Sequence, residues 1–457
     1  MTAGTEFREG TYGTKVVAVE PGGAGFIPLQ ERHGRPLSLL WTWMSPNLEF
    51  ATIFVGVISV LYFHQTFWQA VGALIVGTAL GAVSHGFLSA RGPSTGVPQM
   101  VLSRMAFGFR GNALPAGLNA IVAGIGWFAV NSVSGTLALS ALTGLPAPFW
   151  LVVVVLAQVG IAFFGHNLVH VFERAVLPVL AIVFLLATVF TFAAATPGAE
   201  PGGGGLGGFL LTVGAAFGYA AGWNPYATDY TRYLSPTVSR KMTGLYAGLG
   251  VFISCVVLEV VGAASATIPG PENDNPTAAF TSHLPGWVAA LTLIGIALGA
   301  VSANVLNVYS GAMSFLALGI DLPLKQRRAI VAGVFGVIGF LIALSGLQDA
   351  GAKYENFLLI ISYWIGPWLG VYFADWLLRR EDPSPFLYDR SYTPWAGAVA
   401  MATGMVVSIA LFCNQTLYVA PVPRAVPAVG DITFEVGFVL AAVIYVLLLK
   451  RSRASAA

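Results

Sequence analysis

The sequence is poor in charged residues. Only 9% of its 457 residues are Asp, Glu, Lys or Arg, whereas soluble domains carry about 25%. A chain of this size cannot cover itself with a soluble surface from so few charges, so a water-soluble globular fold is excluded. No feature of the sequence indicates a nucleic-acid partner or an obligate protein partner.

Several other patterns are missing. The two cysteines, Cys255 and Cys413, both lie in apolar runs, which excludes a disulfide framework and a cysteine-based metal site. The histidines show no metal-ligand spacing, so we expect no resident metal and no cofactor. The period-two alternation of an outer-membrane barrel is absent. Residues 1–36 are polar and Gly-rich and lack the apolar stretch of a secretion signal.

Long apolar runs dominate instead. Hydrophobic residues make up 56% of the chain, and the mean hydropathy is +0.77. Many runs reach the roughly 20 residues that a helix needs to cross ~30 Å of hydrocarbon. The sequence therefore predicts an all-α integral membrane protein with twelve transmembrane helices, at these ranges: 38–63, 66–90, 112–140, 148–166, 172–196, 206–230, 242–268, 287–318, 326–346, 353–377, 394–413 and 432–450.

The distribution of Lys and Arg tests this count independently of hydropathy. If the N-terminal tail is placed in the cytoplasm and sides alternate, all of the 22 Lys and Arg residues except Lys353 and Arg424 fall on the cytoplasmic side. Cytoplasmic loops carry this excess of positive charge. One missed or invented span would invert every later loop, so we expect a multi-pass protein of the cell membrane with both termini cytoplasmic.

Two of the predicted spans are interrupted by proline and polar residues. Span one contains Trp43-Met-Ser45-Pro46-Asn47-Leu-Glu49, and span six contains Gly222-Trp223-Asn224-Pro225. Proline removes a backbone donor and clashes with the carbonyl one turn earlier. Within a bilayer, the freed backbone groups must find partners in protein, water or a ligand.

The interruptions fall five spans apart. Broken helices at matching positions of two halves are typical of inverted-repeat transporters with a binding site at the membrane midplane; the alternative is a pair of ordinary proline kinks. The transporter reading divides the chain into a tail (1–37), a first repeat (38–196), a second repeat (197–377), two further C-terminal helices (378–450) and a second tail (451–457).

Polar residues also share faces of spans three and eight. Trp127 and Asn131 are four residues apart and Asn304 and Asn307 three apart, so each pair lies on one helix face. An indole that stacks on a ring and amides that donate and accept hydrogen bonds suit a flat, uncharged heterocycle. Arg and Lys occur only at the ends of spans, so none lies at mid-span to bind a carboxylate. For any single Asn, the alternative is an interhelical hydrogen bond.

Carboxylates inside spans are few and costly in lipid, and they often have functions. Glu49 lies within one turn of the break in span one, which makes it a candidate for coupling to a proton or cation. Glu259 in span seven fits either a coupling role or a buried structural hydrogen bond. Asp229 and Arg232 at the end of span six are predicted to form a structural pair.

Three classes of function fit a polytopic chain. A channel needs a continuous polar pore or a charged ring, but the polar residues here are isolated patches beside helix breaks. An intramembrane enzyme needs a nucleophile with a base or a set of metal ligands, and neither arrangement is present. We therefore favour a cation-coupled secondary symporter, not an enzyme, whose partners are a small heterocyclic substrate, a proton or Na⁺, and the bilayer.

Four stretches resemble the nucleobase cation symporter family, in its purine–cytosine permease branch. They are Trp43-Met-Ser-Pro-Asn47, Gly92-Pro-Ser-Thr-Gly96-Val-Pro-Gln99-Met-Val-Leu-Ser103-Arg104-Met-Ala-Phe107-Gly108, Gly222-Trp223-Asn-Pro-Tyr-Ala-Thr-Asp229-Tyr-Thr-Arg232-Tyr, and Asn304-Val-Leu-Asn307-Val-Tyr309-Ser310. They occur in the family's order over roughly residues 30–390. The second stretch is the most specific.

The resemblance implies a LeuT-like fold of five plus five helices in inverted repeats, with two extra C-terminal helices. It also implies roles for residues at matching positions. Trp127 and Trp223 are similar to the two aromatics that enclose the heterocycle, with Asn131, Asn304 and Asn307 as amides on its edge and Ser45 and Asn47 at the first break. Glu173 is similar to a helix-four glutamate implicated in transport, and Ser302 to a sodium-binding hydroxyl.

The chain departs from the family pattern in span eight. Relatives often read Asn-Asn-x-Pro-Asn, where this chain has Ala303-Asn304-Val-Leu306-Asn307. One amide and one proline are therefore missing from the expected wall of the pocket. Besides a nucleobase, related substrates stay open: a hydroxymethylpyrimidine vitamin precursor, vitamin B6, allantoin or a hydantoin.

Overall fold

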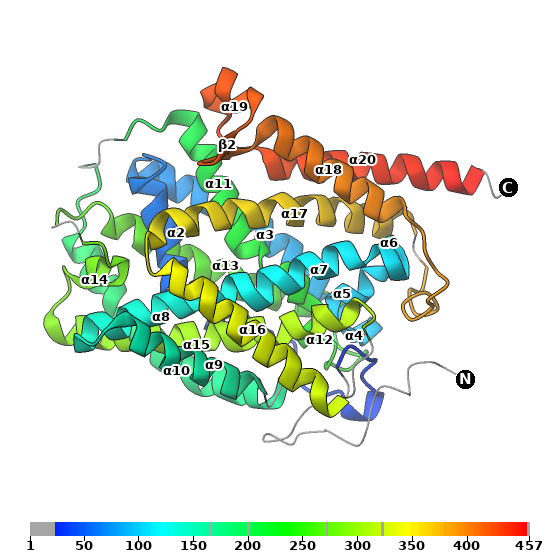
Figure 1. The fold of residues 1–457 in the computed structure, drawn as a ribbon, viewed down its shortest axis with the longest axis horizontal. Helices are drawn as coiled ribbons and strands as arrows, with labels where there is room; N and C mark the ends of the chain where they lie inside the picture. The colour runs from blue at the N-terminus through cyan, green and yellow to red at the C-terminus, as the bar shows by residue number, and fades with distance from the viewer. Residues whose placement is uncertain are drawn as a thin grey trace.

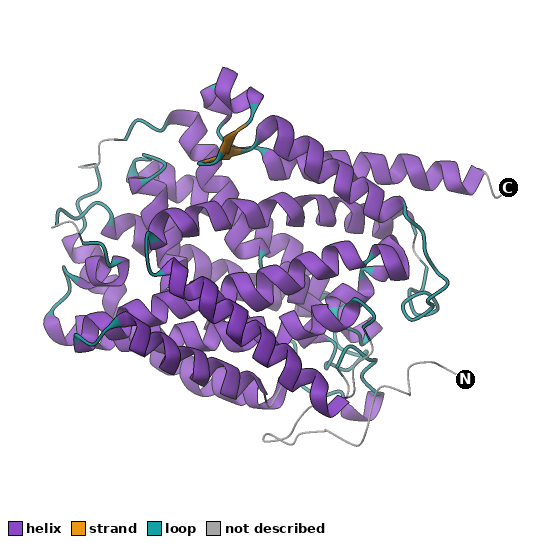
Figure 2. Ribbon diagram, in the orientation of Figure 1, coloured by secondary structure: helices purple, strands orange, loops and turns teal. Residues whose placement is uncertain are grey.

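The structure is a computed structural model. It describes residues 23–163, 166–198, 202–270, 273–320, 324–379 and 381–454, and within these ranges the side chains of 162–163, 166–170, 173, 324–332 and 452–454 are left out. The described chain is mostly helical, with one short β-hairpin (Figure 2). This confirms the helical membrane class.

The helices up to residue 194 supply the first five predicted spans. After the 3₁₀ turn η1 (Leu29–Glu31) they are α1 (Ser38–Met44), η2 (Ser45–Asn47), α2 (Phe50–Leu61), α3 (Phe67–Ser89), α4 (Gly92–Thr95), α5 (Gln99–Leu102), α6 (Arg104–Gly111), α7 (Ala113–Ile121), the π-helical turn η3 (Val122–Trp127), α8 (Phe128–Thr143), α9 (Ala147–Phe163) and α10 (His166–Ala194).

The remaining elements supply the other seven. They are α11 (Gly205–Ala221), η4 (Asn224–Tyr226), α12 (Ala227–Thr231), α13 (Arg240–Ser265), α14 (Pro276–Thr281), α15 (Gly286–Ala317), α16 (Leu324–Gly346), α17 (Ala350–Leu378), α18 (Ala396–Phe412), β1 (Asn414–Gln415), β2 (Tyr418–Val419), α19 (Pro421–Ala425), η5 (Pro427–Val429) and α20 (Thr433–Ala454). Strands β1 and β2 pair antiparallel.

The helices coincide with the twelve predicted ranges. In the described part of the chain, eight helices are long and apolar enough to cross a membrane, and a broken pair, Ser38–Asn47 with Phe50–Leu61, makes a ninth. Three shorter apolar helices, in α9, α16 and α18, fall at the three remaining ranges. The twelve-span prediction is consistent with this arrangement.

The two predicted interruptions differ in geometry. The first bends the chain by 60°, because Glu49 is fully extended (φ −153°, ψ 173°) between η2 and α2. The sixth span, from Gly205 to Thr231, is not bent by more than 40° at its break. There Pro225 lies inside the 3₁₀ turn η4, and the Tyr226 N–H donates to the Trp223 carbonyl at 3.0 Å, so a hydrogen bond bridges the break.

Small residues let the helices approach closely. A Cβ on Gly56 of α2 would lie 1.8 Å from the Glu259 carbonyl oxygen of α13, and one on Gly262 of α13 would lie 1.8 Å from the Ile53 carbonyl oxygen. Such contacts between backbones are how helices associate in membranes, where lipid is as apolar as the side chains. They fix α13 against α2, the second half of the first span.

The two ends of the bundle carry different segments. Figure 1 shows η1, α4, α5, α6 and α12 at the same end as the last turns of α20, whereas α14 lies at the opposite end. Helices α18 and α20 run together along one side of the bundle beside α17 (Figure 1). The broken segments lie in the interior, where their polar residues are buried.

Candidate functional site

A small cavity lies among four spans: the broken first and sixth spans, the third span with η3 and α8, and the eighth span, α15. It is lined by Glu49, Trp127, Asn131, Tyr219, Trp223, Ala303 and Asn307. Its volume is about 10 Å³, close to the ~10–15 Å³ that one water needs. Five residues singled out from the sequence therefore meet at one point, and a ring-sized molecule would fit only if their side chains moved apart.

A chain of amides fixes how Asn131 is oriented. The Asn304 Nδ2 donates to the Phe128 carbonyl at 2.8 Å, which leaves its Oδ1 as an acceptor. Asn131 Nδ2 donates to that oxygen at 3.0 Å, and Asn307 Nδ2 donates to it at 3.3 Å. The Asn131 Oδ1 is buried and has no hydrogen-bond partner among the described residues. Because Asn304 sets the direction of the chain, the free group on Asn131 is an acceptor.

The broken helices are tied together at this point. Trp223 donates from Nε1 to Asn47 Oδ1 at 2.8 Å, and Asn47 donates from Nδ2 to the Trp43 carbonyl at 2.7 Å. The second bond satisfies a carbonyl near the break around Pro46. Asn47 thus stands behind the cavity and positions Trp223, whereas Trp127 packs edge-on against Tyr219 with ring centroids 5.4 Å apart.

Glu49 is buried at the N-terminal end of α2. The positive end of the helix dipole favours a carboxylate there. Tyr219 donates to Glu49 Oε1 at 3.5 Å and shares a 2.5 Å hydrogen bond with the hydroxyl of Thr52. Glu49 Oε2 has no hydrogen-bond partner among the described residues, so the cavity wall carries a second free acceptor.

Tyr219 was missed from the sequence. It lies four residues before Trp223, one helical turn earlier on the same face, and this spacing was the signal that could have found it. The structure places its hydroxyl between Glu49 of the first span and Thr52 of α2. Tyr219 therefore links the carboxylate of one broken helix to the other broken helix.

Ser302, the predicted sodium ligand, belongs to α15, the helix that packs against the first break. Gly299 of α15 approaches so closely that an added Cβ would lie 2.5 Å from the Leu48 carbonyl oxygen. Ser302 follows one turn later and is buried, as are Ser45 and Pro46 of η2. Oxygen-rich, non-helical backbone beside a hydroxyl is the kind of surface that coordinates Na⁺ in transporters. No cluster of three or more His, Cys, Asp or Glu occurs among the residues that the structure describes.

Glu259 and Asp229 lie away from the cavity. Glu259 is buried in α13, where Thr78 of α3 donates to its Oε2 at 2.7 Å. Glu173 belongs to α10, but its side chain lies outside the part of the chain that is described. Asp229 accepts from the Gln99 backbone N–H at 2.9 Å.

Arg232 is buried and binds several segments. Its Nε donates to the Asp229 backbone carbonyl at 3.3 Å, its Nη1 to the Gly23 carbonyl at 3.0 Å, and its Nη2 to the Tyr309 hydroxyl at 3.0 Å. Arg232 therefore connects the end of the sixth span with the N-terminal segment and α15. The contacts are wider than the single pair with Asp229 that the sequence suggested.

His85 lies near the end of a span in the sequence, yet its imidazole is fully buried in α3. Its ring lies edge-on to Trp43 with centroids 4.2 Å apart. Trp43 also contacts Trp223 at 5.8 Å, so His85 supports the wall of the site from behind.

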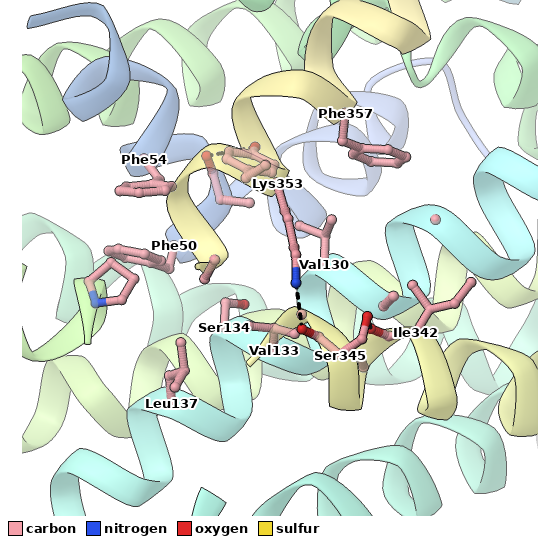
Figure 3. A pocket seen from close by; sticks show the side chains of 18 residues that line it. Phe50, Phe54, Val130, Val133, Ser134, Leu137, Ile342, Ser345, Lys353 and Phe357 are labelled. Atoms are coloured by element: carbon pink, nitrogen blue, oxygen red, sulfur yellow. Dashed lines mark hydrogen bonds between the residues drawn. The ribbon is translucent and has the colours of Figure 1, made fainter. Parts of the chain in front are cut away.

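A larger, mostly apolar pocket adjoins the cavity at Trp127. It has a volume of about 170 Å³, and Figure 3 shows Phe50, Phe54 and Phe357 around it, with Lys353 donating to the Ser345 carbonyl. Trp127 packs edge-on against Phe357 at 5.1 Å and Tyr354 at 6.4 Å. Trp127 therefore stands between this pocket and the amides.

A helical membrane bundle whose broken helices surround a buried polar site belongs to the class of secondary transporters. The sequence profile described as "Permease for cytosine/purines, uracil, thiamine, allantoin" matches residues 26–437. The chain belongs to this family, and its members are permeases and not enzymes.

Relatives match along most of their length. A putative purine-cytosine permease, YxlA of Bacillus subtilis, is 28% identical over 438 residues, covering 93% of this chain and 94% of the relative. The purine-cytosine permease fcyB of Emericella nidulans is 28% identical over 429 residues, covering 89% and 83%.

The fold is that of a solved transporter. The inward-facing structure of Mhp1 superposes with a TM-score of 0.74 at 20% identity and covers 96% of both chains. Mhp1 in a closed conformation with bromovinylhydantoin bound, a nucleobase-cation-symport-1 family transporter, superposes with a TM-score of 0.70. The LeuT-like architecture expected from the sequence is thereby confirmed.

Proposed function

We propose that the protein is a symporter that carries a nucleobase or a related small heterocycle, driven by a proton or Na⁺. The observation that carries the proposal is the pair of buried free acceptors, Asn131 Oδ1 and Glu49 Oε2, on a cavity that also holds two indoles. Unpaired buried acceptors are costly. A flat ring with N–H donors would satisfy both while stacking on Trp127 and Trp223.

The class of substrate is supported by the relatives. YxlA and fcyB are named as purine-cytosine permeases, and Mhp1 was solved with a hydantoin. Nucleobases and hydantoins share a planar ring with adjacent N–H and C=O groups. Because Ala303 contributes no amide to the wall, a vitamin precursor, vitamin B6, allantoin or a hydantoin is the alternative substrate within the same mechanism.

Two sets of groups suit the coupling ion. A proton would use the buried carboxylates, with Glu49 at the cavity and Glu259 in α13 behind it. Sodium would use the backbone at the break, Ser45 and Ser302. In either case the repeats 38–196 and 197–377 would rock against each other around the site, and the pocket beside Trp127 would be the approach from the outside.

The proposed orientation places both termini in the cytoplasm. The end of the bundle that carries η1, α4 to α6 and the last turns of α20 (Figure 1) is also the basic end, with Arg91, Arg104 and Arg240 among its residues. Cytoplasmic loops are the basic ones. Lys353 lies at the opposite end, beside the pocket in Figure 3.

A binding screen tests the proposal. Purified protein would be titrated with nucleobases, pyrimidine vitamins and hydantoins, with and without Na⁺, and unfolding temperatures would be compared with those of Trp127→Ala and Asn131→Ala. One heterocycle should stabilise the wild type and neither variant, and a Na⁺ dependence would name the coupling ion. Equal stabilisation of all three proteins, or of none, would refute the site.

A further inference from the structure

A deep groove opens between α3, α13 and α17, away from the central cavity. Its volume is about 1380 Å³, well above the ~300–1,000 Å³ of pockets that hold small molecules. Backbone contact forms its floor: an added Cβ on Gly86 would lie 2.8 Å from the Gly244 carbonyl oxygen, and one on Gly248 would lie 3.0 Å from the Ala82 carbonyl oxygen.

The walls of the groove are apolar and face outward. Val83 and Phe87 of α3 and Leu377 of α17 line it and are 58%, 54% and 67% exposed. In a membrane protein such side chains meet lipid tails. Trp376 also lines the groove, and tryptophan is enriched at the level of the lipid headgroups.

One end of the groove is basic. The residues that form it are Arg91, between α3 and α4, and Arg240 and Lys241, at the start of α13. Arg91 lies over the rings of Tyr372 and Trp376, with its guanidinium carbon 5.7 Å and 5.3 Å from their centroids. Neither Arg240 nor Lys241 forms an ion pair with any residue that the structure describes.

The acidic residues at the same end leave a positive excess. Arg379 is paired with Asp375 at 2.5 Å, and Asp382 accepts hydrogen bonds from the Ser384 N–H and hydroxyl. Glu381 and Asp382 therefore stand against Arg91, Arg240 and Lys241, which leaves an excess of one positive charge. An apolar channel that ends in a net positive charge matches a molecule with fatty tails and a negatively charged head.

We propose that this groove binds an anionic phospholipid, with its acyl chains along α3 and α13 and its phosphate group at Arg91, Arg240 and Lys241. In the proposed orientation of the chain this basic end is cytoplasmic, so the lipid would belong to the inner leaflet; this placement rests on that orientation. The site itself does not depend on the transported substrate, since the groove is separate from the cavity at Trp127.

Native mass spectrometry of the detergent-purified full chain tests this. Phosphatidylglycerol or phosphatidylcholine would be added, and bound lipids counted for wild type and for the double variant R240Q/K241Q. Each cation near an anionic lipid surface contributes about 1 kcal/mol, so phosphatidylglycerol should bind roughly 30-fold more weakly to the double variant, which loses two cations. Phosphatidylcholine binding should not change, and the matched variant K450Q/R451Q, with both changes in α20, should bind like wild type.

A second pair of variants tests the apolar walls. Val83→Trp would fill the groove, whereas Val443→Trp would place the same bulk on the exposed face of α20. Only Val83→Trp should lower phosphatidylglycerol binding. The proposal is overturned if R240Q/K241Q binds both lipids as wild type does, if soluble glycerol phosphate displaces the lipid, or if Val83→Trp changes the oligomeric mass but not the lipid count.

Discussion

The two broken helices differ in backbone geometry and in the side chains that they contribute, although their sequences look alike. The first bends by 60° at an extended residue and ends in a carboxylate at the start of α2. The sixth passes through a 3₁₀ turn without a bend above 40° and contributes rings, Tyr219 and Trp223. Proline and asparagine mark both positions, but the backbone after the proline differs. It is extended at Glu49, where a new helix begins, and stays in a 3₁₀ turn after Pro225.

The proposed function gives the two breaks distinct roles. In that proposal the first break would bind the coupling ion, through Glu49, Ser45 and Ser302. The sixth would supply a flat surface for a ring. The hydrogen bond from Trp223 to Asn47 joins the two broken helices, so a movement of one helix would break this bond or displace the other helix. The predictions below separate these roles.

Glu49→Gln should have the largest effect. The amide keeps the shape of the side chain but cannot carry the charge that couples transport to an ion. Concentrative uptake into proteoliposomes should fall on the order of 100-fold, near the upper end of coupling effects between sites, while exchange of labelled for unlabelled substrate persists.

Glu355→Gln is the control for this change, because Glu355 is a half-buried carboxylate of α17 outside the cavity lining. If both variants lose concentrative uptake to the same extent, Glu49 has no special role in coupling.

Trp127→Ala and Asn131→Ala should weaken substrate binding by about 10- to 100-fold. Stacking of a base on an aromatic ring is worth roughly 1–3 kcal/mol, and Asn131 carries the free acceptor. Equilibrium binding to purified protein gives the numbers. Asn119→Ala is the matched control, because Asn119 is a buried asparagine that donates to Ser314 at 2.7 Å away from the cavity; an equal loss in that variant would point to general destabilisation.

Trp223→Phe should weaken binding by about fivefold. It removes the hydrogen bond to Asn47, worth roughly 1 kcal/mol, and keeps an aromatic face. Trp43→Phe in the first span is a sharp control, since Trp43 Nε1 has no hydrogen-bond partner among the described residues. Similar losses in the two variants would show that the bond between the breaks contributes nothing.

Gly299→Ala should have the smallest effect on binding and act mainly on stability. The added Cβ would lie 2.5 Å from the Leu48 carbonyl oxygen, and overpacking of this kind costs about 1–3 kcal/mol. Thermal unfolding in detergent should shift down by several degrees. Gly160→Ala, with nothing within 4 Å of its added Cβ, should be unchanged, and equal shifts would contradict the close contact between α15 and the break.

The overall architecture could be predicted because hydropathy and charge act locally. Apolar runs located the spans, and helical spacing predicted that Trp127 shares a helix face with Asn131, and Asn304 with Asn307. The difference in geometry between the two breaks could not be predicted from the sequence. It depends on whether the backbone N–H after the proline, at Glu49 or at Tyr226, finds a carbonyl acceptor in the preceding turn. His85 and Tyr219 were overlooked for a similar reason: their partners, Trp43 and Glu49, come from other spans.

Uptake into sealed proteoliposomes tests the central claim most directly. A labelled heterocycle identified by the binding screen would be supplied outside, with an imposed gradient of protons or of Na⁺. The account predicts accumulation above the external concentration with one of the two gradients, and its complete collapse when an ionophore dissipates that gradient. Equilibration to the external concentration with or without a gradient would mean a passive facilitator and would contradict the account.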